Sequence, residues 1–298
     1  MNMDVDNLID LLREVCAKYT SSSEAFQELG QTFFKDLITH HAPKLCKELE
    51  SGGRALESEV GYFVIQNLGI EKLEPTLAEL LAIAIGSFYG EPTKTDQKDG
   101  RIAWPIKYDA KSTQKNKTFS QTMGEAEFHT DTQYFDNPER YFGLFCIVSD
   151  EEGKGTNELV SGADIVDYIQ KKYGSEVVET LKQPYPFRVP SVFTKSGTDN
   201  DIEVTWKPIL NEKGDIRYRF DTIQTALESP VVSLSEEQTK ALDCVVEAIK
   251  NIPHTKHHLL PGEAIFVNNH RLLHARTFFD NPDRFLYRVR IIPSHHAE

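Results

Sequence analysis

The sequence predicts an α+β protein with a mainly β centre, an antiparallel double-sheet barrel decorated with helices. Many short runs rich in β-branched and aromatic residues are interspersed with amphipathic helical segments. Strands and helices do not alternate strictly, which argues against a parallel sheet with crossover helices. No low-complexity linker divides the 298 residues, so we expect one domain over 1–298, with a helical N-terminal part, 1–58, packed on the barrel.

The first elements follow from apolar spacing and capping residues. Apolar residues recur at helical spacing from Val5 to about Lys18, which predicts the first helix. Ser22 or Ser23 is expected to cap a second helix that runs to about Leu45. Further elements are expected at 62–65 (strand), 76–88 (helix) and 102–108 (strand). The lysine-bearing segment 111–117 is predicted to be either a surface loop or a lid over an active site.

The second half of the chain carries most of the predicted strands. The dense apolar run 141–148 predicts a buried strand. Ser235 as cap and two glutamates in the first turn predict a helix over 235–251. Two more helices are expected at 163–172 and 175–182. The remaining strands are expected at 187–189, 202–208, 216–220, 257–260, 263–267 and 285–292.

Charge and cysteine content exclude several classes of function. The formal net charge is −13 and the pI is about 5.3, which argues against binding to nucleic acid or to anionic membranes. The four cysteines are scattered without Cys-x-x-Cys pairs, so free thiols in a reducing compartment are expected. No basic-then-apolar leader and no run of about 18 apolar residues is found. We therefore expect a cytoplasmic protein.

The first candidate for chemistry is the His-x-Asp pair His129 and Asp131. In an extended chain these two side chains leave the same side, because strand side chains alternate with period two. One imidazole and one carboxylate supply two ligands of a facial triad, and the third is expected to be a histidine far along the chain. Such a triad with open positions is typical of non-haem Fe(II) oxygenases.

The C-terminal segment offers the third ligand and a cation. His274 follows a predicted strand and a tight turn, and His270, four residues earlier, is the rival candidate for the third ligand. Arg288 falls inside the predicted strand 285–292. A cation among residues expected to be buried needs an anionic partner, and the planar guanidinium suits a carboxylate.

The order His129-x-Asp131, then His274, then Arg288 resembles the Fe(II)/2-oxoglutarate-dependent oxygenases of the taurine dioxygenase superfamily, in particular their clavaminate synthase-like branch. The segment 262–276, Gly-Glu-x-x-x-x-x-Asn-His-Arg-x-x-His-x-Arg, is similar to the final ligand motif of that branch. The resemblance covers about residues 60–292 and favours His274 over His270. It implies a double-stranded β-helix, the jelly-roll or cupin-like barrel.

The resemblance also implies a cofactor set. His129, Asp131 and His274 would bind Fe(II), and Arg288 would hold the distal carboxylate of 2-oxoglutarate. Thr156 would help to hold this cosubstrate, although one glycine of the family's motif is displaced here. With O2, the chemistry releases succinate and CO2 and oxidises an unactivated C–H bond. Related halogenases carry a small residue at the carboxylate position, so Asp131 implies a non-halogenating oxidation.

The expected substrate is a free amino acid or a small molecule derived from one, hydroxylated at an aliphatic carbon. Arg276 is expected to meet its carboxylate, and Asp221 or Glu127 its ammonium, while Arg290 would lie near the substrate or cosubstrate. Arg219 and Asp221 could instead form a surface ion pair. Desaturation, cyclisation and a sulfonate substrate remain open, as does the oligomeric state. The non-oxygenase alternatives are a cupin-type metal-dependent enzyme and a binding barrel. Arg288 and Thr156 argue against both, because only a dicarboxylate cosubstrate requires the two residues together.

Overall fold

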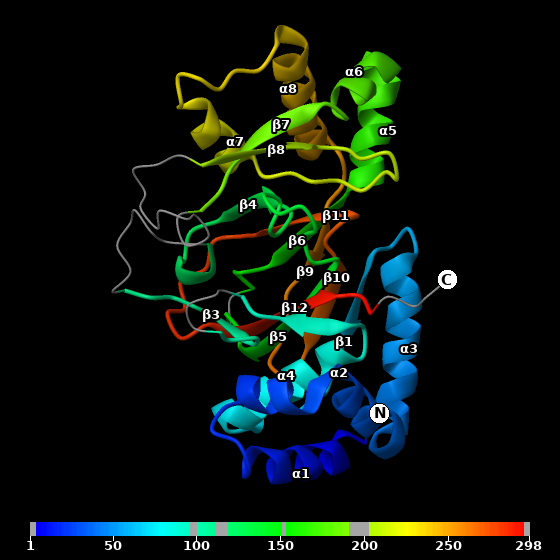
Figure 1. The fold of residues 1–298 in the computed structure, drawn as a ribbon, viewed down its shortest axis with the longest axis vertical. Helices are drawn as coiled ribbons and strands as arrows, with labels where there is room; N and C mark the ends of the chain where they lie inside the picture. Colours follow the sequence, from blue (N-terminus) through cyan, green and yellow to red (C-terminus); the bar gives the residue numbers. More distant parts are fainter. Residues whose placement is uncertain (1–3, 96–99, 111–118, 151–152, 191–202, 295–298) are drawn as a thin grey trace.

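The computed structural model describes residues 4–95, 100–110, 119–150, 153–190 and 203–294. These residues form a stack of layers, in which N-terminal helices, a large sheet, a small sheet and C-terminal helices follow one another (Figure 1). None of the helices in these ranges is both long and apolar enough to cross a membrane. The layered antiparallel architecture agrees with the fold class that the sequence predicts.

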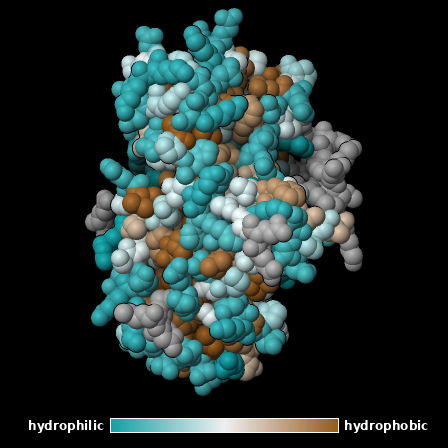
Figure 2. Space-filling model, turned by 180° about the vertical axis from the view of Figure 1, so that it is seen from behind, coloured by the Kyte–Doolittle hydropathy of each residue, from teal (hydrophilic) through white to brown (hydrophobic). Residues whose placement is uncertain are grey.

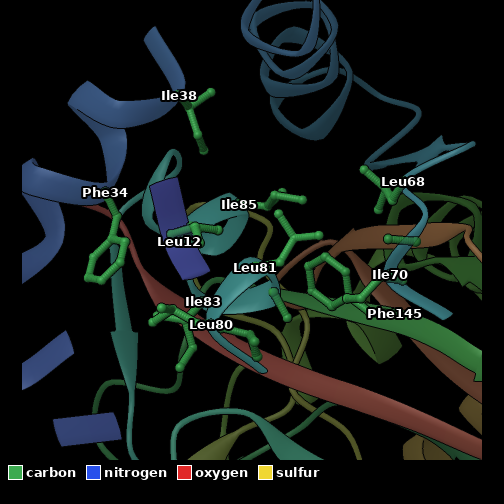
Figure 3. Close-up of a cluster of buried hydrophobic side chains, with 14 of the residues drawn as sticks. Leu12, Phe34, Ile38, Leu68, Ile70, Leu80, Leu81, Ile83, Ile85 and Phe145 are labelled. Carbon is green, nitrogen blue, oxygen red and sulfur yellow. The ribbon is translucent and has the colours of Figure 1, made fainter. Parts of the chain in front are cut away.

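Four helices cover the outer face of the large sheet. They are α1 (Val5–Cys16), α2 (Ser22–His41), α3 (Pro43–Glu57) and α4 (Pro75–Ser87), with the short helix η1 (Ile70–Lys72) before α4. Helix α4 is buried along most of its length, because it lies between α1 and α2 on one side and the sheet on the other. Its side chains join one apolar cluster that runs from α1 to β12. Figure 3 shows Leu80, Leu81 and Ile83 of α4 within this apolar cluster.

The predicted C-terminal end of the second helix, at about Leu45, is wrong. Helix α2 ends at His41, and α3 begins at Pro43 after the single residue Ala42. Pro43 takes the first helical turn of α3, where its missing N–H is not needed. The predicted cap is also wrong: the N-cap of α2 is Ser21, not Ser22 or Ser23, and its side chain accepts a hydrogen bond from Glu24 N.

The two sheets form the barrel. The large sheet has the order β1-β10-β5-β12-β2, with β3 also paired to β12, and the small sheet has the order β4-β11-β6-β9. The large sheet comprises β1 (Tyr62–Ile65), β2 (Glu91–Thr93), β3 (Trp104–Lys107), β5 (Tyr141–Val148), β10 (Ala264–Asn268) and β12 (Phe285–Ile292). The small sheet comprises β4 (Ala126–His129), β6 (Asn157–Ser161), β9 (Thr255–His257) and β11 (Leu272–Arg276). An apolar cluster that includes Phe142, Ile265 and Leu286 fills the space between them.

The C-terminal helices cover the other side of the small sheet. They are α5 (Gly162–Tyr173), α6 (Ser175–Thr180), α7 (Phe220–Leu227) and α8 (Glu236–Asn251), accompanied by the hairpin of β7 (Pro184–Arg188) and β8 (Val204–Pro208). Helix α8 begins at the predicted cap, since Ser235 and Gln238 form a capping box. The predicted strand 216–220 is wrong: it holds only isolated bridges at Ile216 and Arg219, and α7 begins at Phe220.

Candidate metal centre

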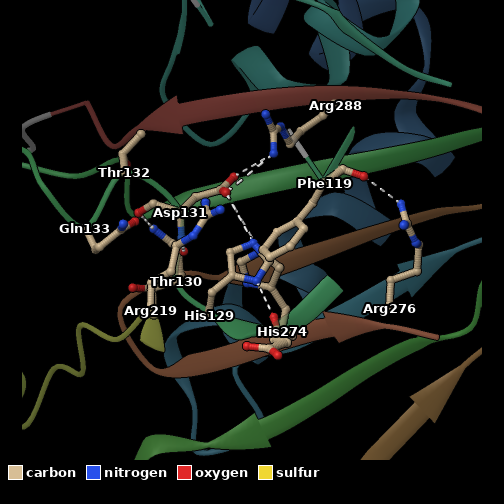
Figure 4. A network of polar contacts seen from close by, with 12 residues as sticks. Phe119, His129, Thr130, Asp131, Thr132, Gln133, Arg219, His274, Arg276 and Arg288 are labelled. Atoms are coloured by element: carbon tan, nitrogen blue, oxygen red, sulfur yellow. Dashed lines mark hydrogen bonds and ion pairs between the residues drawn. The ribbon is translucent and has the colours of Figure 1, made fainter. Parts of the chain in front are cut away.

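Three candidate metal ligands come together at one end of the small sheet. His129 is the last residue of β4, Asp131 lies in the turn that follows, and His274 is the middle residue of β11. One ligand atom from each lies within 4.8 Å of the other two. The Nε2 atoms of His129 and His274 are 3.8 and 4.0 Å from Asp131 Oδ1, and Figure 4 shows the three side chains converging. Two imidazole nitrogens and one carboxylate oxygen are the donor set of a facial triad.

The β4–β11 pairing and one backbone hydrogen bond determine the positions and orientation of the two imidazoles. His129 and His274 face each other directly in the antiparallel β4–β11 pair, and their ring centroids are 4.2 Å apart. The Nδ1 of His129 lies 2.7 Å from Glu127 O, so this nitrogen donates its proton there and Nε2 keeps a lone pair for a metal. His274 packs against Phe142 with ring centroids 4.5 Å apart. Its buried Nδ1 has no partner among the described residues.

Two arginines of β12 hold the carboxylate. Arg288 Nη1 donates to Asp131 Oδ2 at 3.1 Å and to Oδ1 at 3.4 Å. Arg290 Nε donates to Asp131 Oδ2 at 3.1 Å. The buried cation that the sequence indicated in this strand therefore has an anionic partner within the chain. Arg290, which was predicted to lie near the substrate or cosubstrate, contacts the candidate metal ligand itself.

Burial and neighbouring charges give the three groups the protonation states that a metal ion requires. Burial, helped by the cation of Arg219, lowers the pKa of His129 to about 4. Burial and the neighbouring His129 hold the pKa of His274 well below its ordinary value. Burial alone would raise the pKa of Asp131, but the two arginines of β12 hold it well below its usual range. At neutral pH the cluster is therefore two neutral imidazoles and one carboxylate, which fits Fe(II).

A cavity with a cationic wall opens beside the cluster. Arg276, Arg284 and Arg288 all line it together with His129 and His274. Burial lowers the pKa of Arg276 to about 9 and the pKa values of Arg284 and Arg288 to about 10. The buried Nε atoms of Arg276 and Arg288 have no hydrogen-bond partner among the described residues. A small dicarboxylate would bring anionic charge to these guanidiniums, so the residues also fit 2-oxoglutarate.

Thr156 is engaged in its own turn. Its hydroxyl donates to Gly153 O at 2.5 Å, and its backbone N–H donates to Thr277 Oγ1 at 2.9 Å. The next residue, Asn157, lines the cavity, and Thr156 does not. Thr156 is therefore next in sequence to a residue of the cavity wall but does not itself line the cavity. Arg284, which does line the cavity, was not among the predicted residues.

Arg276 fastens the segment that precedes β4. Its Nη1 donates to Phe119 O at 3.0 Å, and its Nη2 donates to Thr122 O at 2.9 Å and to Gly124 O. The ring of Phe119, in the short helix η3 (Phe119–Gln121), lies 5.2 Å from the ring of His129. Figure 4 shows Arg276 reaching the Phe119 carbonyl. Arg276 thus supports a segment that covers one of the ligands.

Arg219 lies at the site, although the sequence analysis considered it only as the ion-pair partner of Asp221. It forms a backbone bridge with His129, and its guanidinium lies 4.5 Å from the centre of the Phe119 ring. Its Nε and Nη2 donate to the two carboxylate oxygens of Asp221 at 2.9 and 3.1 Å. Asp221 is therefore paired within the chain, as in the ion-pair alternative left open by the sequence. The Arg-x-Asp spacing in the sequence was the pattern that indicated this ion pair.

Glu127 and the rival histidine lie apart from the cluster. The Glu127 side chain is exposed and lines a second cavity of about 420 Å³ with Lys250 and His254. The Nε2 of His270 is 3.0 Å from Pro138 O, and His270 is not part of the three-residue cluster. The possible lid at 111–117 lies outside the described residues.

The fold and the cluster together define a class of protein, a double-stranded β-helix with a two-histidine, one-carboxylate site. A model of the taurine catabolism dioxygenase TauD, TfdA family matches residues 25–290, and the chain belongs to that family. Clavaminate synthase 2 of Streptomyces clavuligerus is 27% identical over 181 residues, a match that spans 58% of this chain and 51% of that protein. The match thus spans about half the length of this curated relative.

Solved structures share the fold over nearly the whole chain. Asparagine oxygenase in complex with Fe(II), 2S,3S-3-hydroxyasparagine and succinate has a TM-score of 0.73 at 17% identity, covering 97% of this chain and 91% of its own. The non-heme iron oxygenase OrfP with Fe and alpha-ketoglutaric acid has a TM-score of 0.70 at 16% identity, covering 98% and 92%. The family and fold class predicted from the sequence are confirmed.

Proposed function

We propose that the protein is an Fe(II)- and 2-oxoglutarate-dependent dioxygenase that hydroxylates an aliphatic carbon of a free amino acid or an amino-acid-derived small molecule. The observation that carries this proposal is the convergence of His129, Asp131 and His274 beside a cavity lined by buried arginines. Family membership supports the same reaction class. Iron, O2 and 2-oxoglutarate would together supply the oxidant for an unactivated C–H bond, with release of succinate and CO2.

The residues of this chain would bind, orient and shield. His129 and His274 offer Nε2 lone pairs, and Asp131 offers an ionised carboxylate, so no proton must leave before the metal binds. Arg288 would hold the distal carboxylate of 2-oxoglutarate while its Nη1 stays on Asp131. Phe142, Leu144 and Leu286 form an apolar part of the cavity wall, which would keep water away from the reacting carbon.

An amino-acid-like substrate is supported by the relatives and by charge. The asparagine oxygenase structure holds a hydroxyasparagine, and an OrfP structure holds (3S)-hydroxy-L-Arg. Arg219 forms a backbone bridge with His129 and is paired with Asp221. A zwitterion would bring the complementary anion and cation to the two members of this pair. The Asp221 side chain is 42% exposed, so it would meet a substrate ammonium group without being uncovered first.

The test begins under anaerobic conditions. Fe(II) and 2-oxoglutarate are added to the metal-free protein, and the weak visible charge-transfer band of chelated cosubstrate is recorded. We expect the band in the wild-type protein and its loss in Asp131→Ala and in His274→Ala. Amino acids are then screened for succinate release in air. Product mass distinguishes hydroxylation, which adds one oxygen, from desaturation or cyclisation, which removes two hydrogens.

His270→Ala is the matched control, because His270 was the rival third ligand and lies outside the cluster. The band should persist in this variant. A folded, iron-loaded wild-type protein without the band would exclude the proposed reaction class and return the chain to a metal-binding barrel of another kind.

A further inference from the structure

Asp131 lies outside the β-strands, unlike the two histidines. His129 ends β4 and His274 lies inside β11, whereas Asp131 sits in the turn beyond β4. The following residue, Thr132, has a φ of 53°, a left-handed conformation that β-branched residues rarely adopt. The surrounding structure must therefore impose this backbone.

The side-chain amide of Asn269 supplies the missing backbone partner. Asp131 N donates to Asn269 Oδ1 at 2.7 Å, and Asn269 Nδ2 donates back to Asp131 O at 3.1 Å. The two residues are 138 positions apart in the chain. This reciprocal pair of bonds gives Asp131 the kind of support that a β-ladder gives His129. Asn269 is only 2% exposed, so the bonds form away from competing water.

A buried glutamate extends the contact into a closed frame. Asn269 Nδ2 also donates to Glu139 O at 2.9 Å, and the Glu139 carboxylate accepts from Thr132 Oγ1 at 2.6 Å. The frame thus fixes both Asp131 and the unusual Thr132 backbone. Asn269 lies in the turn between β10 and β11, the strand that carries His274. It therefore links the segment of the carboxylate ligand to the segment of the distant histidine.

We infer that Asn269 is a positioning residue for the metal site, which holds the backbone of Asp131 so that its carboxylate joins the two imidazoles. The inference rests on the proposed function, because it assumes that the cluster binds a metal ion. Residues that hold metal ligands in place typically change metal affinity about 10- to 100-fold when they are replaced. Asn269 touches no ligand atom of the cluster itself, so its effect must pass through Asp131.

The neighbouring Asn268 offers a matched control. It is also an asparagine and is 0% exposed. Its Nδ2 donates to Leu56 O at 3.0 Å, and its Oδ1 accepts from His270 N at 3.1 Å. Asn268 thus supports helix α3 and the turn but does not bond to Asp131. Loss of either side chain removes hydrogen bonds of a buried residue, and of the two only loss of Asn269 frees the backbone of Asp131.

The experiment compares Asn269→Ala with Asn268→Ala in the full-length, metal-free protein. Co(II) is titrated anaerobically and its d–d absorption bands are recorded, since they report affinity and ligand geometry without turnover. Thermal unfolding of the metal-free variants measures stability. We expect both variants to lose stability. Only Asn269→Ala should bind Co(II) about 10- to 100-fold more weakly, with altered bands at saturation.

The other possible outcomes would each overturn the positioning role of Asn269. Wild-type Co(II) affinity and bands in Asn269→Ala, or equal losses of affinity in both variants, would overturn the positioning role and leave the proposed function intact. Absence of Co(II) binding by the wild-type protein would overturn both. Asn269→Ser keeps a polar group and repeats the test if the alanine variant fails to fold. Failure of both Asn269 variants to fold would overturn the inference, because the residue would then be required for the fold.

Discussion

Arg276, which is buried, and Arg288, whose side chain is 14% exposed, lie on the wall of the same cavity, yet their partners differ. Arg276 donates to three backbone carbonyls of the segment before β4. Arg288 donates to the carboxylate of Asp131. The comparison teaches that burial and residue type alone do not identify a ligand-binding cation. The bonding partners separate the two residues: Arg276 holds the segment before β4, and Arg288 contacts the candidate metal ligand Asp131.

The largest effect is expected from Arg288→Gln. The variant loses the cation that faces the cosubstrate, while Arg290 still bonds to Asp131 and keeps this ligand in the site. The binding free energy of 2-oxoglutarate should therefore weaken by about 2–4 kcal/mol, which raises its dissociation constant on the order of 30- to 1,000-fold. Titration of the charge-transfer band in Fe(II)-loaded protein measures it. Wild-type affinity for 2-oxoglutarate in this variant would remove Arg288 from the site.

Arg276→Gln should act on stability instead. Removing a charged donor from the carbonyls of Phe119, Thr122 and Gly124 is expected to lower the free energy of unfolding by about 2–3 kcal/mol, with a smaller change in 2-oxoglutarate affinity than in Arg288→Gln. Urea denaturation and the same cosubstrate titration measure both quantities. If cosubstrate affinity fell as far as in Arg288→Gln while stability stayed constant, the contrast between the two arginines would be wrong.

Burial, with the cations of Arg219 and Arg288, lowers the pKa of His129 and keeps it neutral, which gives a pH dependence. The pKa of His129 is about 4 in the folded protein and 6.5 ordinarily. Below pH 6.5 the unfolded imidazole gains a proton and the folded one does not. The metal-free protein should therefore lose about 1–2 kcal/mol of stability from this group between pH 6.5 and 5. Urea denaturation across this range, with His129→Gln as control, checks it; equal pH slopes in the two proteins would exclude the effect.

The smallest effect is expected from Asp221→Asn. The Arg219–Asp221 pair is partly exposed, with side chains 22% and 42% accessible, so its loss should change the free energy of unfolding by less than about 1 kcal/mol. If Asp221 binds the substrate ammonium group, KM for the amino acid rises while stability and 2-oxoglutarate affinity stay unchanged. A wild-type KM would leave Asp221 with the ion pair alone.

Local patterns predicted the regular elements well. The apolar run of β5 and the capped helix α8 were both readable, because burial and capping are encoded in neighbouring residues. Helix α3 was missed since only Ala42 separates it from α2. No strand was predicted over β11, because its pairing with β4 and β6 is non-local.

The candidate site was predicted where a short motif carried it, and missed where it depended on tertiary contacts. His129 and Asp131 are neighbours in the sequence, and a family resemblance pointed to His274 and Arg288. Nothing local shows that Asn269 bonds to Asp131, since asparagine in a turn is expected on other grounds. Whether Thr156 holds the cosubstrate stays a prediction, because its hydroxyl bonds within its own turn.

The direct pairing of His129 with His274 has a consequence for how the chain reaches its native state. A slip of one residue between β4 and β11 would turn one imidazole to the opposite face of the sheet. The complete ligand set therefore exists only in correctly aligned chains. An ion that binds only the native form stabilises it by RT ln(1 + [metal]/Kd). Metal binding would therefore raise the population of correctly aligned molecules relative to misaligned ones.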